Sequence, residues 1–489
     1  MTDPVVASAM PAKRMVTGGV RVLLAESLLI PSGLLTAAYL ARRLGPDGYG
    51  IFMVAAAVVA WVEWGLTGIF ARASVKFVAE AADWRPIGST IVSVHLALAT
   101  AAAALLVLLA GVVARILDTP ALATPLRLFA LDIPLFCLAQ AHRSILVGTG
   151  DFESRALAAA ARWVSRLLLV ILFVELGLSL HGAVLGSIGA SLVEVVVCRR
   201  AVRPALSARA TRDVGRLWSV VAPLIVSSLA LRLFDRLDLV TLTAVGGSPE
   251  QAGHYGAAQN LAILPSIVGV SFAPLLLATL THAFRDGQQA AVRRIGGQAM
   301  RWVVLLTPVA ALCAGASRGI VHLVFGPEFG PTAPLIAPLL FSAIALVMIA
   351  VSTSILIAAG RPGLTAAFTT PMPALAGLGY LMVIPRYGPS GASMVTLLVS
   401  VAAAVALGTT VFRVCRVHPP PATVLRSALV CVAVYGAALL WSQSGTLVLV
   451  EIAVLAAASF LALACMGEFT PAERSALMGW WKRGPRPAT

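Results

Sequence analysis

Four ionisable side chains lie within one apolar stretch of the sequence. The stretch reads LALRLFDRLDLVTLTAVGG over residues 229–247 and contains Arg232, Asp235, Arg236 and Asp238. At 100° per residue, these four side chains occupy about half of a helix circumference. Each of them would cost about 2.5–3.5 kcal/mol at the centre of a membrane-spanning helix. We therefore expect the four groups to face water or one another rather than hydrocarbon.

Three interpretations of these charges stay open at this point. Arg232 and Asp235 are three residues apart and could neutralise each other in place. Arg232 and Arg236 are one turn apart and could present a binding face to an anion such as a pyrophosphate, because a planar guanidinium can bind phosphate oxygens in a bidentate way. Asp235 and Asp238 could instead carry a coupling proton or sodium ion.

Other polar residues in apolar segments are candidates for a cavity. Glu26, Glu63 and Asp132 lie in predicted helices and could line a cavity or carry a coupling ion. Gln259 and Asn260 lie near the start of a later predicted helix and could hydrogen-bond sugar hydroxyls.

Three further ionisable residues, Arg143, Glu175 and Glu194, lie nearer predicted helix ends, where we expect solvated side chains. The six cysteines form no CxxC pair, and the sequence contains neither an HExxH motif nor a GxxxxGK[ST] loop. We therefore expect no catalytic residues, no metal site and no cofactor, and we do not expect an enzyme.

The composition predicts a helical membrane protein. Of the 489 residues, 59% are hydrophobic and only 12% are charged, whereas soluble domains contain about 25% charged residues. The net charge of +15 does not indicate nucleic-acid binding, because the basic residues lie mainly in short segments between apolar runs, as expected for cytoplasmic loops.

The apolar runs predict about fourteen membrane-spanning helices. Basic residues concentrate in alternate loops, which places both termini in the cytoplasm. We expect the helices at residues 20–41, 50–70, 87–113, 125–147, 156–177, 182–198, 217–244, 254–281, 300–324, 332–359, 363–384, 389–411, 424–441 and 446–466.

Short motifs recur in order about 206–210 residues apart, which indicates an internal repeat. The pairs are Tyr49-Gly50 with Tyr255-Gly256, Gly150 with Gly360, and Gly182 with Gly391. The repeat predicts two six-helix lobes related by a pseudo-two-fold axis along the membrane normal. The expected parts are an N-terminal lobe at 1–198, a basic cytoplasmic linker at 199–216, a C-terminal lobe at 217–412, and two further helices with a cytoplasmic tail at 413–489.

Several segments resemble the polysaccharide flippases of the multidrug/oligosaccharidyl-lipid/polysaccharide exporter superfamily, and the resemblance covers nearly the whole chain. The segments are ARRLGPDGYGIF at 41–52, VEWGLTGIFAR at 62–72, RLDLVTLTAVGGSPEQAGHYGAA at 236–258, HLVFGPEFGPTAPLI at 322–336, SILIAAGRP at 354–362 and IPRYGPSGAS at 384–393.

The resemblance implies a V-shaped cavity between the two lobes and alternating access. It also implies transport of a polyprenyl-pyrophosphate-linked oligosaccharide, or a related exopolysaccharide or lipopolysaccharide precursor, across the bacterial inner membrane. Glycosyltransferases or a polymerase of the same pathway would then be partners, together with membrane lipids. The alternative is a drug or metabolite antiporter on the same scaffold, coupled to protons or sodium ions.

Overall fold

The described part of the chain is helical, and no strand occurs among its residues in the computed structural model. The structure describes residues 28–81, 83–205, 230–263, 276–277, 279–441, 445–469 and 473. Contacts divide the chain into two compact units, which are residues 1–260 with 366–395 and residues 261–365 with 396–489. The lobe boundaries expected from the sequence stay a prediction.

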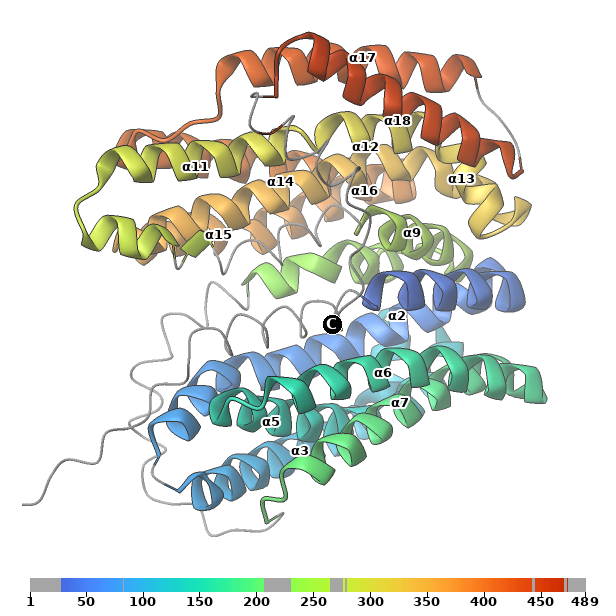
Figure 1. Ribbon diagram of the computed structural model, residues 1–489. Helices are drawn as coiled ribbons and strands as arrows, with labels where there is room; N and C mark the ends of the chain where they lie inside the picture. The colour runs from blue at the N-terminus through green and yellow to red at the C-terminus, as the bar shows by residue number, and fades with distance from the viewer. Residues whose placement is uncertain are drawn as a thin grey trace, which may run out of the picture. The chain divides into compact units, whose positions relative to one another are not determined.

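The first unit contains the N-terminal helices and the charged segment at 230–244. Within it, α6 packs along α7, and α5 contacts α2, α3 and α7 (Figure 1). Its helices are α2 (Leu29–Glu80), α3 (Trp84–Ile116), η1 (Pro120–Leu122), α4 (Ala123–Phe129), α5 (Asp132–Thr149), α6 (Phe152–Phe173), η2 (Val174–Leu178), α7 (Ser179–Ala201), residues 230–244 and α9 (Pro249–Ala262).

The second unit contains the helices that follow. Within it, α12 packs against α14 and α17, and α17 contacts α18. Its helices are residues 279–285, α11 (Gln289–Val304), α12 (Thr307–Gly315), α13 (Ser317–Val324), η3 (Pro327–Thr332), α14 (Ala333–Ala358), α17 (Pro421–Trp441) and α18 (Leu447–Cys465). Three helices contribute residues to both units, namely α9, whose last two residues belong to the second unit, α15 (Pro362–Thr369) and α16 (Met372–Cys415).

Three of the longest helical stretches are interrupted at a glycine. The backbone has φ of 66° at Gly45, 87° at Gly177 and 53° at Gly388. Glycine adopts this left-handed region readily because it has no Cβ. At Gly45 and Gly388 the next residue is proline, which removes a backbone donor and clashes with the preceding turn. Each glycine therefore separates two of the helices that the apolar runs predict.

The helix count agrees with the prediction. Nine described stretches are long and apolar enough to cross a membrane. Three of them, Pro31–Gly68, Phe152–Ala201 and Pro362–Cys415, contain the interrupting glycines, so each corresponds to two predicted spans. The remaining predicted spans, at 217–244 and 254–281, are described only in part. The all-α polytopic fold with fourteen helices is confirmed.

Two helices that end at corresponding positions of the expected internal repeat, α5 and α14, end in the same way. Gly150 closes α5 with φ of 77°, and Gly360 follows α14 with φ of 73°. In both places the glycine N–H donates to a carbonyl three residues back, and the next N–H donates to one five residues back, at 2.9–3.1 Å. This is the Schellman arrangement, in which glycine at the left-handed position satisfies the last carbonyls of a helix.

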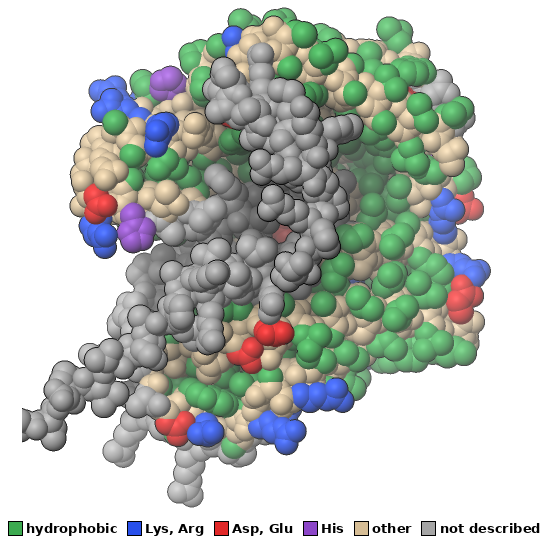
Figure 2. Space-filling view, in the orientation of Figure 1, with side chains coloured by type: hydrophobic (Ala, Val, Ile, Leu, Met, Phe, Trp, Pro, Cys, Tyr) green, Lys and Arg blue, Asp and Glu red, His purple; other side chains and the backbone are tan. Residues whose placement is uncertain are grey.

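The surface is that of a protein surrounded by lipid. Large apolar side chains are exposed along several helices, such as Leu108 at 78% on α3 and Leu440 at 91% on α17. Figure 2 shows many hydrophobic side chains on the described surface, with the charged ones in small groups. Soluble monomers rarely expose extended apolar patches. The chain is therefore a multi-pass membrane protein.

A buried ionic network holds the end of the chain in the second unit. Arg301 on α11 donates to Glu468 at 2.7 Å and to Glu473 at 2.9 Å. Glu468 also accepts hydrogen bonds from Thr423 at 2.6 Å and from Arg426 at 2.9 Å. Both Arg301 and Glu468 are at most 7% exposed. We call these five residues the C-terminal clamp, because they fasten the segment after α18 to α11 and α17.

Candidate functional site

The charged segment at 230–244 is helical, and its four ionisable residues divide into two environments. Arg232 and Asp235 are exposed, Arg236 is half-buried, and Asp238 is 2% exposed. Among the described residues no ion pair joins Arg232 to Asp235. The Arg232 guanidinium instead lies over the ring of Trp64 on α2, with its carbon 4.8 Å from the ring centre. A cation over an indole face gains electrostatic attraction without being neutralised.

Asp238 lies in a buried hydrogen-bond network with α9. One carboxylate oxygen accepts from the Tyr255 hydroxyl at 2.7 Å, and the other accepts from the Gln259 amide at 2.8 Å. Arg236 donates to the Gln259 carbonyl oxygen at 2.9 Å. The two ends of the Gln259 amide therefore connect Arg236 to Asp238, which satisfies a carboxylate that would otherwise be expensive to bury.

The second amide of α9 connects this network to α2. Asn260 donates to the Tyr49 hydroxyl at 2.7 Å and to the Gly256 carbonyl at 3.1 Å. Tyr49 is 1% exposed. Both amides expected to contact sugar thus make internal hydrogen bonds, and their role in sugar binding stays a prediction. We call Arg236, Asp238, Tyr255, Gln259, Asn260 and Tyr49 the polar network.

Two glycines let α2 and α9 approach closely enough for this network. A Cβ added to Gly50 would overlap the backbone of Pro249, and one added to Gly253 would overlap the backbone of Pro46. One turn further on, a Cβ added to Gly256 would come within 2.8 Å of Met53. Small residues at such crossings allow backbones to meet in membrane proteins.

A second set of charges is buried between α5, α6 and α7. Glu194 on α7 is 0% exposed. It accepts a hydrogen bond from Arg162 at 2.9 Å and lies 3.3 Å from the Arg143 guanidinium. Arg162 also contacts the Ser191 hydroxyl at 3.3 Å. One carboxylate with two arginines is a compact ionic centre, and its hydrogen bonds offset the desolvation of the charges.

Both arginines of this centre lie close to one aromatic ring. The guanidinium carbons of Arg162 and Arg143 lie 4.8 Å and 5.5 Å from the centre of the Phe136 ring. Glu63 and Asp132, predicted as cavity or coupling residues, are 6% and 5% exposed. Both interact electrostatically with Arg162 and with Arg166, one turn later on α6. We call Glu63, Asp132, Arg143, Arg162, Arg166 and Glu194 the buried charge cluster.

The structure corrects the sequence-based expectation for two of these residues. We expected solvated side chains at Arg143 and Glu194, but the side chains are 13% and 0% exposed. Glu175, which we also expected to be solvated, is exposed and pairs with Arg43. Spacing could have indicated the cluster, because Arg162 and Arg166 are one helical turn apart in an apolar segment. Glu26 lies outside the described residues.

The described residues contain no group of three or more His, Cys, Asp or Glu side chains that could hold a metal ion. Every carboxylate of the buried charge cluster has an arginine within electrostatic range. The cluster can therefore hold charge inside the helix bundle and could exchange a proton or an ion.

Membrane-spanning helices that enclose paired charges are typical of membrane transporters. The comparison with known families agrees with this class. The family model described as polysaccharide biosynthesis protein matches residues 18–277, which is more than half of the chain. The chain therefore belongs to the polysaccharide biosynthesis protein family. No curated protein matches it.

Solved structures show the same fold at low sequence identity. The lipid II flippase MurJ in an inward closed conformation has a TM-score of 0.72 and 12% identity, covering 93% of this chain and 98% of MurJ. An inward-facing multidrug resistance MATE transporter of the MOP superfamily has a TM-score of 0.59 and 14% identity, covering 86% and 96%. The Vibrio cholerae MATE transporter VcmN in its bent form has a TM-score of 0.54 and 14% identity, covering 88% and 98%. The fold is that of the MOP superfamily.

Proposed function

We propose that this chain is a flippase that moves a lipid-linked oligosaccharide or polysaccharide precursor across the bacterial inner membrane by alternating access. Membership of the polysaccharide biosynthesis protein family supports this proposal. The solved flippase with the same fold is named for a lipid substrate, lipid II. The carrier we propose is a polyprenyl pyrophosphate, and both termini of the chain lie in the cytoplasm. Glycosyltransferases or a polymerase would supply or receive the precursor.

The observation that carries the proposal is the environment of Arg232. Its guanidinium is exposed on a helix predicted to span the membrane, lies over Trp64, and has no carboxylate partner among the described residues. An unneutralised cation at this depth requires water or an anion beside it. The pyrophosphate of a lipid-linked sugar is such an anion, and arginine suits it because its fork matches phosphate oxygens.

Arg236 can assist because its internal pairing leaves most of its donors available. A guanidinium has five N–H donors, and one of its nitrogens is bonded to Gln259 at 2.9 Å. Arg232 and Arg236 lie one turn apart on the same helix. A pyrophosphate placed between them would receive hydrogen bonds from both, while Asp238 remains satisfied by Tyr255 and Gln259.

A second candidate function is a cation-coupled drug or metabolite antiporter. It is favoured by buried oxygens of Glu63 and Asp132 that have no hydrogen-bond partner among the described residues. A buried carboxyl oxygen without a donor is a position where a proton or a cation could bind. Asp235, exposed and unpaired among the described residues, could take part as well. The same carboxyls could equally supply the coupling ion of a flippase.

Transport by reconstituted protein distinguishes the two functions. Liposomes would contain a fluorescent polyprenyl-pyrophosphate-linked oligosaccharide, and an added quencher would report its passage between leaflets. We expect wild-type protein and Arg232→Lys to accelerate this passage, and Arg232→Glu to abolish it at an equal protein level. If Arg232→Glu transports the labelled lipid normally, the proposed anion site is wrong. Proton-driven uptake of a cationic dye, without lipid transport, would establish the antiporter instead.

A further inference from the structure

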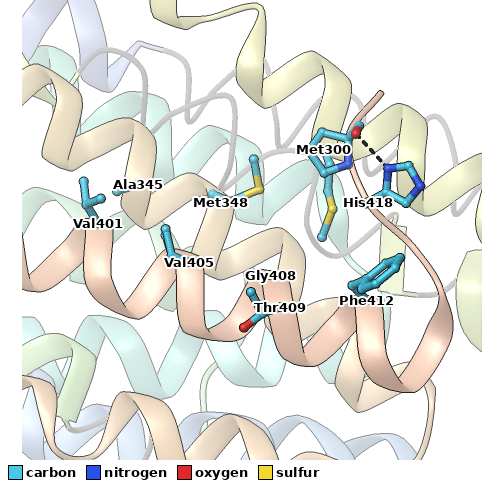
Figure 3. Close-up of a pocket in the computed structure, with 11 residues that line it drawn as sticks. Met300, Ala345, Met348, Val401, Val405, Gly408, Thr409, Phe412 and His418 are labelled. Atoms are coloured by element: carbon cyan, nitrogen blue, oxygen red, sulfur yellow. Dashed lines mark hydrogen bonds between the residues drawn. The ribbon is translucent and has the colours of Figure 1, made fainter. Parts of the chain in front are cut away.

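An apolar groove lies on the second unit, and none of its lining residues is Arg, Lys, Asp or Glu. Its cavity volume is about 560 Å³, within the range of about 300–1,000 Å³ that small-molecule sites occupy. The groove lies between α11, α14, the last part of α16 and the residues that follow α16. Figure 3 shows its lining, which includes Met300, Met348, Val405, Phe412 and His418.

The groove follows one face of α16. Val401, Val405, Gly408 and Phe412 recur at helical spacing and all line it. Val401, Val405 and Phe412 are exposed at 41%, 60% and 42%. A Cβ added to Gly408 would meet nothing within 4 Å. The missing side chain of this glycine is therefore what leaves the middle of the groove open.

One end of the groove is polar and basic. His418 and Thr409 belong to the lining there, and the His418 ring lies 5.6 Å from the Phe412 ring. The guanidinium of Arg416, which is not itself among the lining residues, lies 5.6 Å from the centre of the Phe412 ring. Arg416 is exposed, and no carboxylate pairs with it among the described residues. An unneutralised cation therefore lies beside Phe412, one of the residues that line the apolar groove.

We propose that this groove binds one acyl chain of an anionic glycerophospholipid, with the lipid phosphate held by Arg416. The helix that forms the groove belongs to a candidate membrane span, so acyl chains surround it. A groove on such a helix can be filled by one of these chains through van der Waals packing, and basic pockets between membrane helices attract anionic head groups. An acyl chain fits the narrow apolar length, and a phosphate fits the arginine at its end. The inference does not depend on the transported substrate.

Photo-crosslinking tests the site without any substitution. Purified wild-type protein in nanodiscs would be irradiated with phosphatidylglycerol that carries a diazirine in one acyl chain, and the labelled peptides would be identified by mass spectrometry. We expect labels on peptides that contain Met300, Met348 or residues 401–412, and competition by unlabelled phosphatidylglycerol. Labels spread evenly over other exposed helices, without competition, would overturn the proposal.

Two substitutions and a matched control test the two parts of the lipid. Gly408→Leu fills the groove and should lower retention of phosphatidylglycerol in native mass spectrometry several-fold, because the added side chain occupies the space that the acyl chain would take. Gly436→Leu on α17 is the control, since Gly436 also has open space around its Cβ position. Arg416→Asn removes the charge and suits the left-handed backbone at φ 56°. It should abolish the preference for phosphatidylglycerol over phosphatidylcholine.

Two outcomes of these measurements would contradict the proposed lipid site. If Gly408→Leu retains as much phosphatidylglycerol as Gly436→Leu, the chain does not lie in the groove. If wild-type protein retains phosphatidylcholine equally well, Arg416 does not hold the phosphate. Either result overturns the proposal, while lipid-linked sugar transport is measured separately and can succeed in both cases.

Discussion

Gly50 and Gly253 occupy reciprocal positions. Gly50 lies against Pro249, which is four residues before Gly253, and Gly253 lies against Pro46, which is four residues before Gly50. A Cβ at Gly50 would overlap Pro249, and a Cβ at Gly253 would overlap Pro46. The segments PDGYG and PEQAG share this proline–glycine spacing. The sequence comparison aligned Tyr49 with Tyr255 instead. In these contacts Pro46 and Gly50 take the positions that correspond to Pro249 and Gly253, an offset of 203 residues instead of the 206 residues between the two tyrosines.

Substituting either glycine should weaken the crossing of α2 and α9. Gly50→Ala and Gly253→Ala each place a methyl group against backbone atoms that cannot rotate away. We expect each to lower stability by about 1–3 kcal/mol, the usual range for overpacking, measured as the thermal unfolding midpoint in detergent. Gly65→Ala on α2 is the control, because its Cβ would meet nothing within 4 Å, and it should not destabilise the protein. Equal midpoints for all three variants would contradict the close crossing.

Removing one of the hydrogen bonds that the Asp238 carboxylate accepts should destabilise the first unit. Tyr255→Phe keeps the ring and deletes the hydroxyl that lies 2.7 Å from the carboxylate. A buried group left partly unsatisfied costs about 1–3 kcal/mol. The double variant Tyr255→Phe with Asp238→Asn should lose less than the sum of the two single variants, because they share one interaction. Strict additivity in thermal unfolding would show that the bond contributes little.

Neutralising Glu194 should be among the most disruptive single changes in the membrane helices. Glu194→Gln leaves Arg162 and Arg143 without their shared carboxylate, and breaking a buried pair from one side costs about 3–5 kcal/mol. We expect a strong loss of folded protein after extraction in detergent, measured by size-exclusion chromatography. Glu153→Gln on α6, at an exposed position, is the control and should behave like the wild type. A well-folded Glu194→Gln protein would mean that water already neutralises the pair.

The C-terminal clamp should make the thermal stability of the protein decrease at acidic pH. Burial alone would raise the pKa of Glu468, but hydrogen bonds from Thr423, Arg301 and Arg426 hold the pKa below its usual value. A carboxylate with a lowered pKa contributes stability that is complete above the unfolded pKa of about 4.3 and is lost as the pH falls through its folded value. Thermal midpoints should therefore drop below about pH 4. Glu468→Gln should lower the midpoint at neutral pH and reduce this acid dependence.

The sequence predicted the helices well because their signal is local. Long apolar runs need no knowledge of neighbours, and the interruptions at Gly45 and Gly388 are each followed by proline. The long stretches that these glycines divide correspond to separate predicted spans. The Schellman ends at Gly150 and Gly360 also match a pair that the repeat identified. The apolar runs lie within single helices, and the glycine features depend on residues within one or two helical turns.

The partners of charged residues could not be predicted in the same way. Arg143 was expected to be solvated near a helix end, yet Arg143 and Arg162 both contact Glu194 from other helices. Gln259 and Asn260 were interpreted as sugar ligands because polar side chains in an apolar helix indicate a wet site. The structure shows that Asp238 and Tyr49 accept their hydrogen bonds. Which side chain satisfies a buried group depends on helix packing, and a single sequence carries no direct record of that.

The C-terminal clamp also determines what a chain without the last two helices, α17 and α18, would lose. A shortened chain that ended before α17 would lack Glu468, Glu473, Thr423 and Arg426, while Arg301 would remain on α11. That guanidinium would then lose the two carboxylates that neutralise it and the residues that cover it. A twelve-helix descendant of this protein would therefore need a compensating change at position 301, so the terminal hairpin is an integral part of the second unit rather than an appendage.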